Sequence, residues 1–507
     1  MKKILHIYLM LALSLSIISC NMEKLPEGTL DDKTALQILN DLERFRNSLY
    51  GDMRALTNGS FVYLTDLQAD QFQATVLSGN RNGVIHSGIF TSKDAEFQGR
   101  WGSCYAVISS VNYYLEKVNE LKKKQIFTDE EMVHVERYIA EAKFVRALSY
   151  YMLADRYCEL YTEENATTPA KGLPLVTKYH PTGDSTKYPG RNTQEETYYL
   201  IDQDLSDAYF GLVEYEKIDD SNMSPNASYL SSNAVLALQA RIALNKGDKR
   251  TALRLAEKVI ESGKYRLARI SEVQKMWKSD DSKEIIFRPF MSQDELGASI
   301  GSIFLGVKRD QADFIPSFET LSLFSEGDIR RDVYFTIFDL NIEGELIQTY
   351  VFNKYPGNEA LRTTSEPNYM NMSKPFRLSE MYLIAAEAAI EIDPAKANYY
   401  LKELRVNRIA KYNQDISYQG SALIEQIREE RTKELLGEGH RLKDLQRWNL
   451  GFVRGVEHIE NPKVNSILAP NGKGVRYQSN DYRYVWPIPS AEMQANPQLS
   501  GQQNEGY

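Results

Sequence analysis

The chain has 507 residues, of which 42% are apolar and 25% are charged, and its formal net charge is −9. This apolar content is enough for a folded core and excludes an intrinsically disordered chain. Nucleic acid is not expected as a partner, because a phosphate-binding surface has to be basic. The longest basic run, Lys122-Lys123-Lys124, lies beside Glu116 and Glu120 and has the pattern of a solvated helix surface.

The first 19 residues have the pattern of an export signal. Lys2 and Lys3 supply a positive start, and the apolar run from Ile7 to Ile18 is too short for a transmembrane helix, which needs about 20 apolar residues. Cys20 follows directly and offers a thiol for lipid attachment. We predict a lipoprotein signal peptide over residues 1–19 and lipidation of Cys20, in preference to an uncleaved hydrophobic anchor. The mature protein would then be attached to a membrane by lipid alone.

Helical periodicity dominates the rest of the chain. It predicts a helix over 136–157 and helix pairs over 232–264, 378–404 and 423–448. The turn of the second pair is Asp393-Pro394, with proline at a helix start. Small residues near the turns allow two helices to cross closely, as in tetratricopeptide units. About four such units are expected to form a scaffold.

Stretches without helical periodicity separate these units, at 51–95, 160–192, 265–375 and 455–490. Residues 284–288, in the third stretch, are predicted to form a strand. Long ordered loops on a rigid frame are where recognition usually occurs, so we expect the ligand site in these stretches.

Two cysteines besides Cys20 fall in helix-like segments. Cys104 and Cys158 could form one disulfide in an oxidising compartment, but two buried free thiols are favoured. Neither the cysteines nor the dispersed histidines have the spacing of metal ligands, and no convergent acid–base set stands out. No metal and no cofactor is therefore predicted.

A charge-dense block lies near the C-terminus, at 430–447. It contains opposite charges three residues apart: Arg431 and Glu434, Glu438 and Arg441, Arg441 and Asp444, Asp444 and Arg447. This spacing favours a structural ion-pair network along helix surfaces over a catalytic set. Gly437 and Gly439 are expected to form the turn between two helices.

Five segments follow one another in a recognisable order: RLSEMYLIAAEA at 377–388, 401–408, ERTKELLGEGHRLKDLQRW at 430–448, VWPIP at 485–489, and 496–507. Together they resemble the SusD/RagB family of outer-membrane nutrient-binding lipoproteins of Bacteroidetes. Leu442, Cys158 and Glu505 depart from the family pattern, which commonly has an aromatic residue, a glycine and a proline there. These are packing or turn positions, so the departures concern local geometry.

The resemblance implies a mainly α-helical fold, with about four tetratricopeptide-like helix pairs and an irregular loop-rich subdomain with minor strands. Residues 20–507 would form a single domain of this type. It would consist of a helical-repeat part at about 36–265, a loop-rich ligand-binding insertion at about 266–375 and a signature part at about 376–507.

The resemblance also implies a function without catalysis. The protein would be anchored by lipid in the outer membrane, facing the cell exterior. There it would capture an oligosaccharide and deliver it to a SusC-like TonB-dependent transporter. A peptide ligand, as in RagB-like uptake proteins, is the alternative, because the chain has only four tryptophans. A secreted hydrolase and a pure scaffold protein are less favoured.

By analogy with the family, ligand contacts are expected in the loop before the helix of Trp101 and in the insertion after Ile286. The candidate ligand-binding residues are Asp70, Arg81, Trp101, Phe290, Phe314 and Phe318. The helical register of Trp101 with Tyr105 and Ile108 favours a core position for that ring over a ligand contact.

Overall fold

The computed structural model describes residues 36–219, 227–306, 311–455, 461–470 and 474–507. The predicted signal peptide and Cys20 lie outside these ranges. Within them the helices are α2 (Leu39–Leu56), α3 (Ser60–Gln68), α4 (Gly83–Ser87), α5 (Ala95–Lys123), α6 (Asp129–Tyr157), α7 (Gln194–Glu216), α8 (Ser232–Asn245), α9 (Lys249–Glu261), α10 (Ile270–Lys278), α11 (Ser302–Leu305), α12 (Phe318–Ser322), α13 (Ile329–Tyr334), α14 (Leu378–Ala389), α15 (Pro394–Val406), α16 (Gly420–Glu434), α17 (Arg441–Arg447), α18 (Pro462–Ile467) and α19 (Ser490–Ala495).

The strands are short and form two-stranded antiparallel sheets. The pairs are β1 (Phe72–Ala74) with β3 (Phe314–Pro316), β2 (Ile285–Phe287) with β6 (Phe376–Arg377), β4 (Phe335–Ile342) with β5 (Glu345–Phe352), and β7 (Phe452–Val453) with β8 (Arg476–Tyr477). The fold is thus mainly helical, as predicted.

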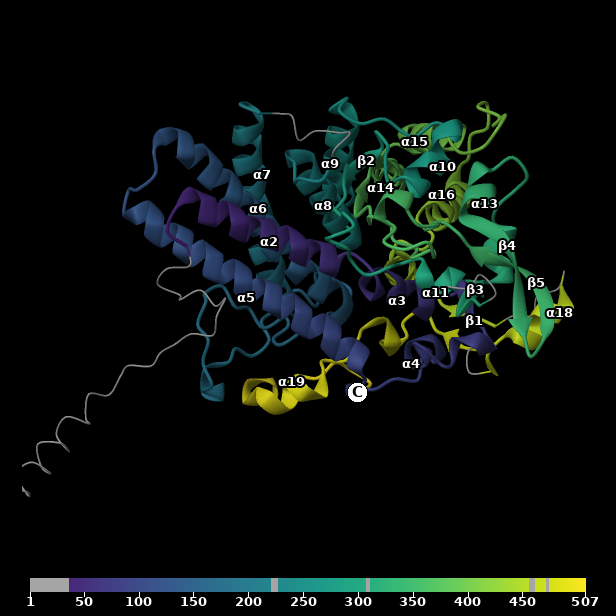
Figure 1. The fold of residues 1–507 in the computed structure, drawn as a ribbon, viewed down its shortest axis with the longest axis horizontal. Helices are drawn as coiled ribbons and strands as arrows, with labels where there is room; N and C mark the ends of the chain where they lie inside the picture. The colour runs from purple at the N-terminus through teal and green to yellow at the C-terminus, as the bar shows by residue number, and fades with distance from the viewer. Residues whose placement is uncertain (1–35, 220–226, 307–310, 456–460, 471–473) are drawn as a thin grey trace, which may run out of the picture.

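The long helices form a continuous stack (Figure 1). Neighbours in the chain pack together from α5 to α9, and α9 then packs against α14, which pairs with α15. Local signals set the ends of these helices. The Thr128 hydroxyl accepts a hydrogen bond from Glu131 N before α6, and Asp248 caps α9 in the same way. The predicted scaffold of helix pairs is confirmed.

The predicted helix ends agree with the structure where a turn residue marks them. The break after Asn245 separates α8 from α9, and Pro394 is the first residue of α15. The helix predicted over 136–157 begins earlier, at Asp129, because the capping box at Thr128 precedes its apolar stripe. The pair predicted over 423–448 corresponds to α16 and α17.

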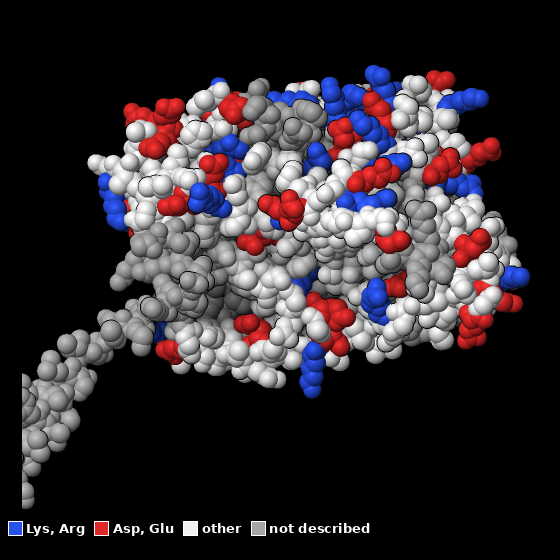
Figure 2. Space-filling view, in the orientation of Figure 1, with Lys and Arg blue, Asp and Glu red and all other residues white. Residues whose placement is uncertain are grey.

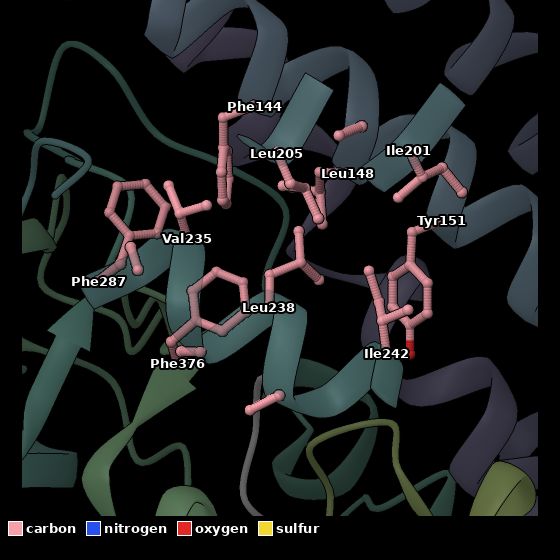
Figure 3. Packing of buried hydrophobic residues seen from close by; sticks show 14 of the residues in the cluster. Phe144, Leu148, Tyr151, Ile201, Leu205, Val235, Leu238, Ile242, Phe287 and Phe376 are labelled. Carbon is pink, nitrogen blue, oxygen red and sulfur yellow. The ribbon is translucent and has the colours of Figure 1, made fainter. Parts of the chain in front are cut away.

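The main core lies between α6, α7 and α8 (Figure 3). Leu148 and Tyr151 from α6 face Ile201 and Leu205 from α7, with Leu238 from α8 between them. Each of these side chains is buried, which stabilises the fold by about 1.5–3 kcal/mol per large apolar side chain. Phe287 of β2 and Phe376 of β6 close this core at one end, so the strand pair is anchored to the stack.

A second apolar core lies under the loop-rich part. It includes Trp277, Phe304, Phe314 and Phe352, all nearly inaccessible to solvent. The insertion is therefore packed on its own core and presents fixed loops.

The β4–β5 hairpin is the largest element that was not predicted. Its turn is Glu343-Gly344, and both residues have positive φ, 52° and 94°, as a two-residue hairpin of this twist requires. The strand predicted over 284–288 is present as β2.

Cys104 lies in α5 and Cys158 directly follows α6, and both are buried free thiols. The favoured prediction for this pair is confirmed. Burial raises the pKa of Cys104 to about 12, so this thiol stays protonated. Among the helices of the described residues, none combines the length and the apolar character needed to cross a bilayer.

Candidate functional site

The charge-dense block lies where the helical stack meets the loop-rich part. Glu434, the last residue of α16, is fully buried. Its oxygens accept hydrogen bonds from three guanidinium groups: Nη1 of Arg377 at 2.9 Å, Nε of Arg408 at 2.9 Å and Nη1 of Arg330 at 3.1 Å. Arg377 precedes α14, Arg408 follows α15 and Arg330 belongs to α13. One carboxylate thus joins the insertion to the stack.

Two further carboxylates extend this buried network. Glu284, directly before β2, accepts hydrogen bonds from Arg377 at 2.8 Å and from Arg408 at 2.8 Å. Glu438 accepts one from Lys354 Nζ at 2.7 Å. Buried charges are tolerated only when they are paired in this way, so the network fixes the position of the loops that the block contacts.

A structural network is confirmed, but its predicted pairing is wrong in three of the four cases. Asp444 and Arg447 do pair, at 2.9 Å. Arg431 binds Asp444 at 2.8 Å, and Arg441 binds Asp70.

For Glu438 and Arg441, the physical reason is the end of the helix at Glu434. Residues 435–440 form a turn in which Gly437 and Gly439 have φ of 73° and 84°, as expected for these two glycines. Helical i,i+3 geometry therefore does not reach from Glu438 to Arg441. The other two predicted pairs do lie within single helices, but Glu434, Arg431 and Arg441 each pair with a group outside their own helix.

The buried pairs predict acid sensitivity. Burial alone would raise the pKa of Glu430, but Arg330, Lys433 and Arg405 outweigh it and lower that pKa to about 2. Glu387 is 13% exposed, and Arg447 lowers its pKa to about 2 in the same way. A carboxylate with a lowered folded-state pKa stabilises the fold above its unfolded pKa and loses this contribution as pH falls through the folded value.

We therefore expect stability to fall between about pH 4.5 and about pH 2, with each of these two carboxylates contributing on the order of 3 kcal/mol at neutral pH. Urea unfolding at a series of pH values measures this. A free energy of unfolding that stays constant from pH 5 to pH 3 would contradict it.

The loop after β2 packs on the junction of α2 and α3. Arg54 Nη1 donates a hydrogen bond to Phe290 O at 2.9 Å and pairs with Glu295 at 3.1 Å. A Cβ added to Gly59, which has φ of 55°, would come within 2.5 Å of Ala298 Cβ, so this glycine permits the close approach. The start of α3 thus holds the loop that carries the exposed ring of Phe290.

One turn further along α3, Tyr63 lies near an ion pair whose guanidinium group is exposed and whose paired carboxylate oxygen is buried. Arg81 Nη1 is 2.8 Å from Asp313 Oδ2, and the Arg81 side chain is 62% exposed whereas Asp313 is 15% exposed. Burial raises the pKa of the half-buried Tyr63, and both Arg81 and Asp313 lie close enough to affect it. We call Tyr63, Arg81 and Asp313 the surface triad.

Strand pairing brings the triad together. β1 and β3 align Ala74 with Phe314, and Thr75 N donates a hydrogen bond to Asp313 O at 2.9 Å. Residues 75–82 then turn back over this pair, with Asn80 and Asn82 at positive φ. Two segments more than 200 residues apart thereby present one cation, one carboxylate and one ring on the same surface.

Of the six candidate ligand-binding residues, two have buried rings. Trp101 is 3% exposed and packs against Tyr105 and Tyr157. Phe314 is inaccessible and packs edge-on to the ring of His86. These two rings support the fold beneath the surface and are not presented to a ligand here.

The other four candidates lie in different settings. Asp70 forms a bidentate pair with Arg441, at 2.8 and 2.6 Å, which lowers the Asp70 pKa against the effect of burial. Arg81 is in the surface triad. Phe290 is 51% exposed and lies in the loop after β2, which packs against the start of α3. Phe318 is the first residue of α12, and its ring is partly exposed.

Sequence reasoning missed Tyr63 and Asp313. Asp313 directly precedes a candidate, and Tyr63 lies in an irregular stretch where recognition was expected. An ion pair across more than 200 residues leaves no local pattern, so only the β1–β3 pairing identifies it. On the face shown in Figure 2, basic and acidic side chains are interspersed.

Comparison with known proteins gives matches to two family profiles, one in each half of the chain. The profile of the SusD family matches residues 340–507, and a second profile, described as starch-binding associating with outer membrane, matches residues 29–244. The chain belongs to the SusD family.

Relatives cover almost the whole of this SusD-family protein. A SusD-like protein of Formosa agariphila is 24% identical, with all of both chains aligned. A SusD superfamily protein of Bacteroides thetaiotaomicron is similar with a TM-score of 0.74 and 24% identity, covering 91% of this chain and 99% of the other. A Bacteroides vulgatus protein provisionally described as sugar binding has a TM-score of 0.75 and 26% identity, covering 94% and 100%.

The surface triad offers the kinds of group that contact polar ligands. A guanidinium group and a carboxylate side by side offer donors and acceptors to neighbouring hydroxyl groups, and a tyrosine ring covers an apolar face. In the described part of this SusD-family chain, no group of three or more His, Cys, Asp or Glu side chains is arranged to hold a metal ion.

Proposed function

We propose that this protein is a non-catalytic oligosaccharide-binding lipoprotein of the outer membrane, attached through lipid at Cys20. The observation that carries the proposal is the surface triad: the exposed guanidinium group of Arg81, paired with the mostly buried carboxylate of Asp313 and close to Tyr63, on loops fixed by a rigid stack. Carbohydrate sites combine rings with a few convergent polar groups in this way. The family description of starch binding at the outer membrane supports the same ligand class.

The ligand site would extend from the triad along α3 to the loop 290–298. Phe290 supplies an exposed ring there, and Arg54 and Glu295 hold the loop by an ion pair. An extended ligand suits such a row of separate contacts better than a single small molecule does. Phe318 remains a candidate for a peripheral contact, whereas Trp101 and Phe314 act as supports.

Delivery to a SusC-like TonB-dependent transporter completes the proposed function. The protein would face the cell exterior and close over the transporter as a hinged lid once ligand is bound. The buried network suits this role, because a lid has to move as one rigid body.

A peptide is the second candidate ligand. The exposed rings on the described surface near α3 are tyrosine and phenylalanine, which accept apolar peptide side chains as readily as sugars.

Binding isotherms against a panel of polysaccharides, oligosaccharides and peptides test the proposal. We expect saturable binding of an oligosaccharide and no shorter products after prolonged incubation. Saturable peptide binding without glycan retention would replace the first ligand class by the second, and release of shorter products would contradict the proposal of binding without cleavage.

A further inference from the structure

A cavity that is partly open to solvent lies apart from the surface triad. It has a volume of about 130 Å³ and lies between α2, α5, α6 and α8 on one side and the charge-dense block on the other. Its wall includes five cationic side chains and three carboxylates: Arg100, Arg241, Lys374, Arg431 and Lys443, and Asp155, Glu438 and Asp444. We call it the central cavity. Pockets for organic ligands are larger, about 300–1,000 Å³, so a sugar oligomer is not its occupant.

Two of the five cations are neutralised from behind the wall. Arg241 pairs with Glu380 at 2.6 Å, and Lys374 pairs with Asp280 at 2.7 Å. These pairs contribute no net charge to the cavity.

Two of the three carboxylates are already paired with cations. Glu438 is bound by Lys354 and Arg377. Asp444 accepts hydrogen bonds from Arg431 Nε at 2.8 Å and Arg447 Nε at 2.9 Å. Neither is free to neutralise another cation at the cavity.

The remaining carboxylate, Asp155, is shared by too many cations. Its Oδ2 pairs with Arg156 at 2.8 Å, and its Oδ1 lies 3.5 Å from Lys443 but accepts no hydrogen bond from the described residues. Arg100 is close enough to lower its pKa. Three buried cations therefore surround one carboxylate, and positive charge is in excess on this side of the cavity.

Unpartnered donors accompany this excess charge. Within the described residues, no atom accepts a hydrogen bond from Arg431 Nη1 or from Arg100 Nε, although these side chains are 1% and 7% exposed and both line the cavity. Both terminal nitrogens of Arg156, just behind the wall, lack an acceptor there too. A buried N–H without an acceptor is costly, and a buried unpaired charge is more so.

The pKa of Lys443 responds to the same surroundings. Burial lowers it to about 8, with Arg156 adding to the effect and Asp155 opposing it. Water could accept hydrogen bonds from the N–H groups, but water carries no charge to offset the excess. A bound anion would accept hydrogen bonds from these donors and would also offset the excess positive charge.

We propose that the central cavity binds a small inorganic anion, held by Arg431, Arg100 and Lys443. The volume equals that of about four water molecules at about 30 Å³ each, enough for a halide or a tetrahedral oxyanion with a little water. The anion would lock the helical stack to the charge-dense block, a role distinct from ligand capture at the surface triad.

The full-length protein is prepared with gluconate as the only small counter-ion and titrated separately with chloride and with phosphate at constant ionic strength. Because an anion that binds only the folded state stabilises it, we expect the unfolding midpoint to rise by about 3 °C at about 100 times the dissociation constant. The two titrations distinguish a halide site from an oxyanion site, and either result supports the proposal.

Lys443→Met removes one donor and should reduce the anion-dependent rise at least twofold. Lys433→Met is the matched control, because Lys433 is equally buried and belongs to the same block but pairs with Glu429, away from the cavity. Equal rises in both variants would indicate a general salt effect and overturn the proposal.

Crystals of the unmodified protein grown with bromide or phosphate give an independent measurement if Lys443→Met does not fold. An anomalous bromide peak, or tetrahedral density, within hydrogen-bond distance of Arg431 Nη1 supports the site. Water density alone in both crystals, with no rise in the midpoint, overturns it. Neither measurement depends on the carbohydrate, so the two proposals fail separately.

Discussion

Replacing Glu434 by glutamine is expected to lower the free energy of unfolding by about 3–5 kcal/mol, the cost of leaving buried charges without their partner. The carboxylate accepts hydrogen bonds from Arg377, Arg408 and Arg330, and all four side chains are at most 1% exposed. A glutamine amide keeps the volume but removes the negative charge and turns one acceptor into a donor facing a guanidinium group. Urea unfolding measures this loss in the free energy of unfolding. A binding measurement on the same sample shows whether the variant still binds its ligand.

Glu429→Gln is the matched control for this variant. Glu429 lies in the same helix, and its partner Lys433 is 3.0 Å away, but its side chain is 35% exposed. We expect a loss below about 1 kcal/mol there, because solvent screens partly exposed pairs. If Glu434→Gln unfolds at the same urea concentration as the control, the network does not hold the insertion to the stack.

The helix pairs could be predicted because their signals are local. The apolar stripe of α6, the Thr128 cap and the Asp393-Pro394 turn each lie within a few residues of the structure that they specify. The β4–β5 hairpin also has a local signal, alternating burial on both sides of Glu343-Gly344. It was not predicted, because residues 284–288 were the only strand identified in the irregular stretch 265–375.

The partners of the charged groups could not be predicted in this way. Glu434 binds residues 26, 57 and 104 positions away in the chain, and no periodicity encodes such distances. The sequence indicated that the block is a structural network, because opposite charges recur three residues apart and its glycines mark a turn. Which charges meet is decided by how α13, α14 and α15 pack.

The same limit applies to the candidate site. Arg81 was proposed by family analogy, and its position in an ion pair depends on Asp313, which β3 places opposite the turn after β1. Trp101 has the helical register of a core residue, and it is one. Of the rings proposed by analogy, Trp101 and Phe314 are buried and Phe290 is exposed. Tertiary packing decides this difference, so the sequence alone does not predict it.

Replacing Arg81 by glutamine is expected to weaken binding of the ligand found in the panel by about 10–100-fold. Such a loss corresponds to about 1.4–3 kcal/mol, the usual range for a hydrogen bond to a charged group. Arg81 is mostly exposed, so losing its pair with Asp313 should change stability little. Isothermal titration calorimetry measures the affinity, and thermal unfolding confirms that the variant is folded.

Lys275→Gln provides a control of the same kind at a distant place. Lys275 in α10 forms an exposed 2.6 Å pair with Asp281, so the variant also removes one surface cation and one ion pair. Its affinity should equal that of the unmodified protein. Because only Arg81 adjoins Tyr63, a general loss of positive charge would weaken both variants equally, whereas a specific site weakens Arg81→Gln alone. Equal affinities in Arg81→Gln and the unmodified protein would place the ligand away from the surface triad even if the protein binds an oligosaccharide.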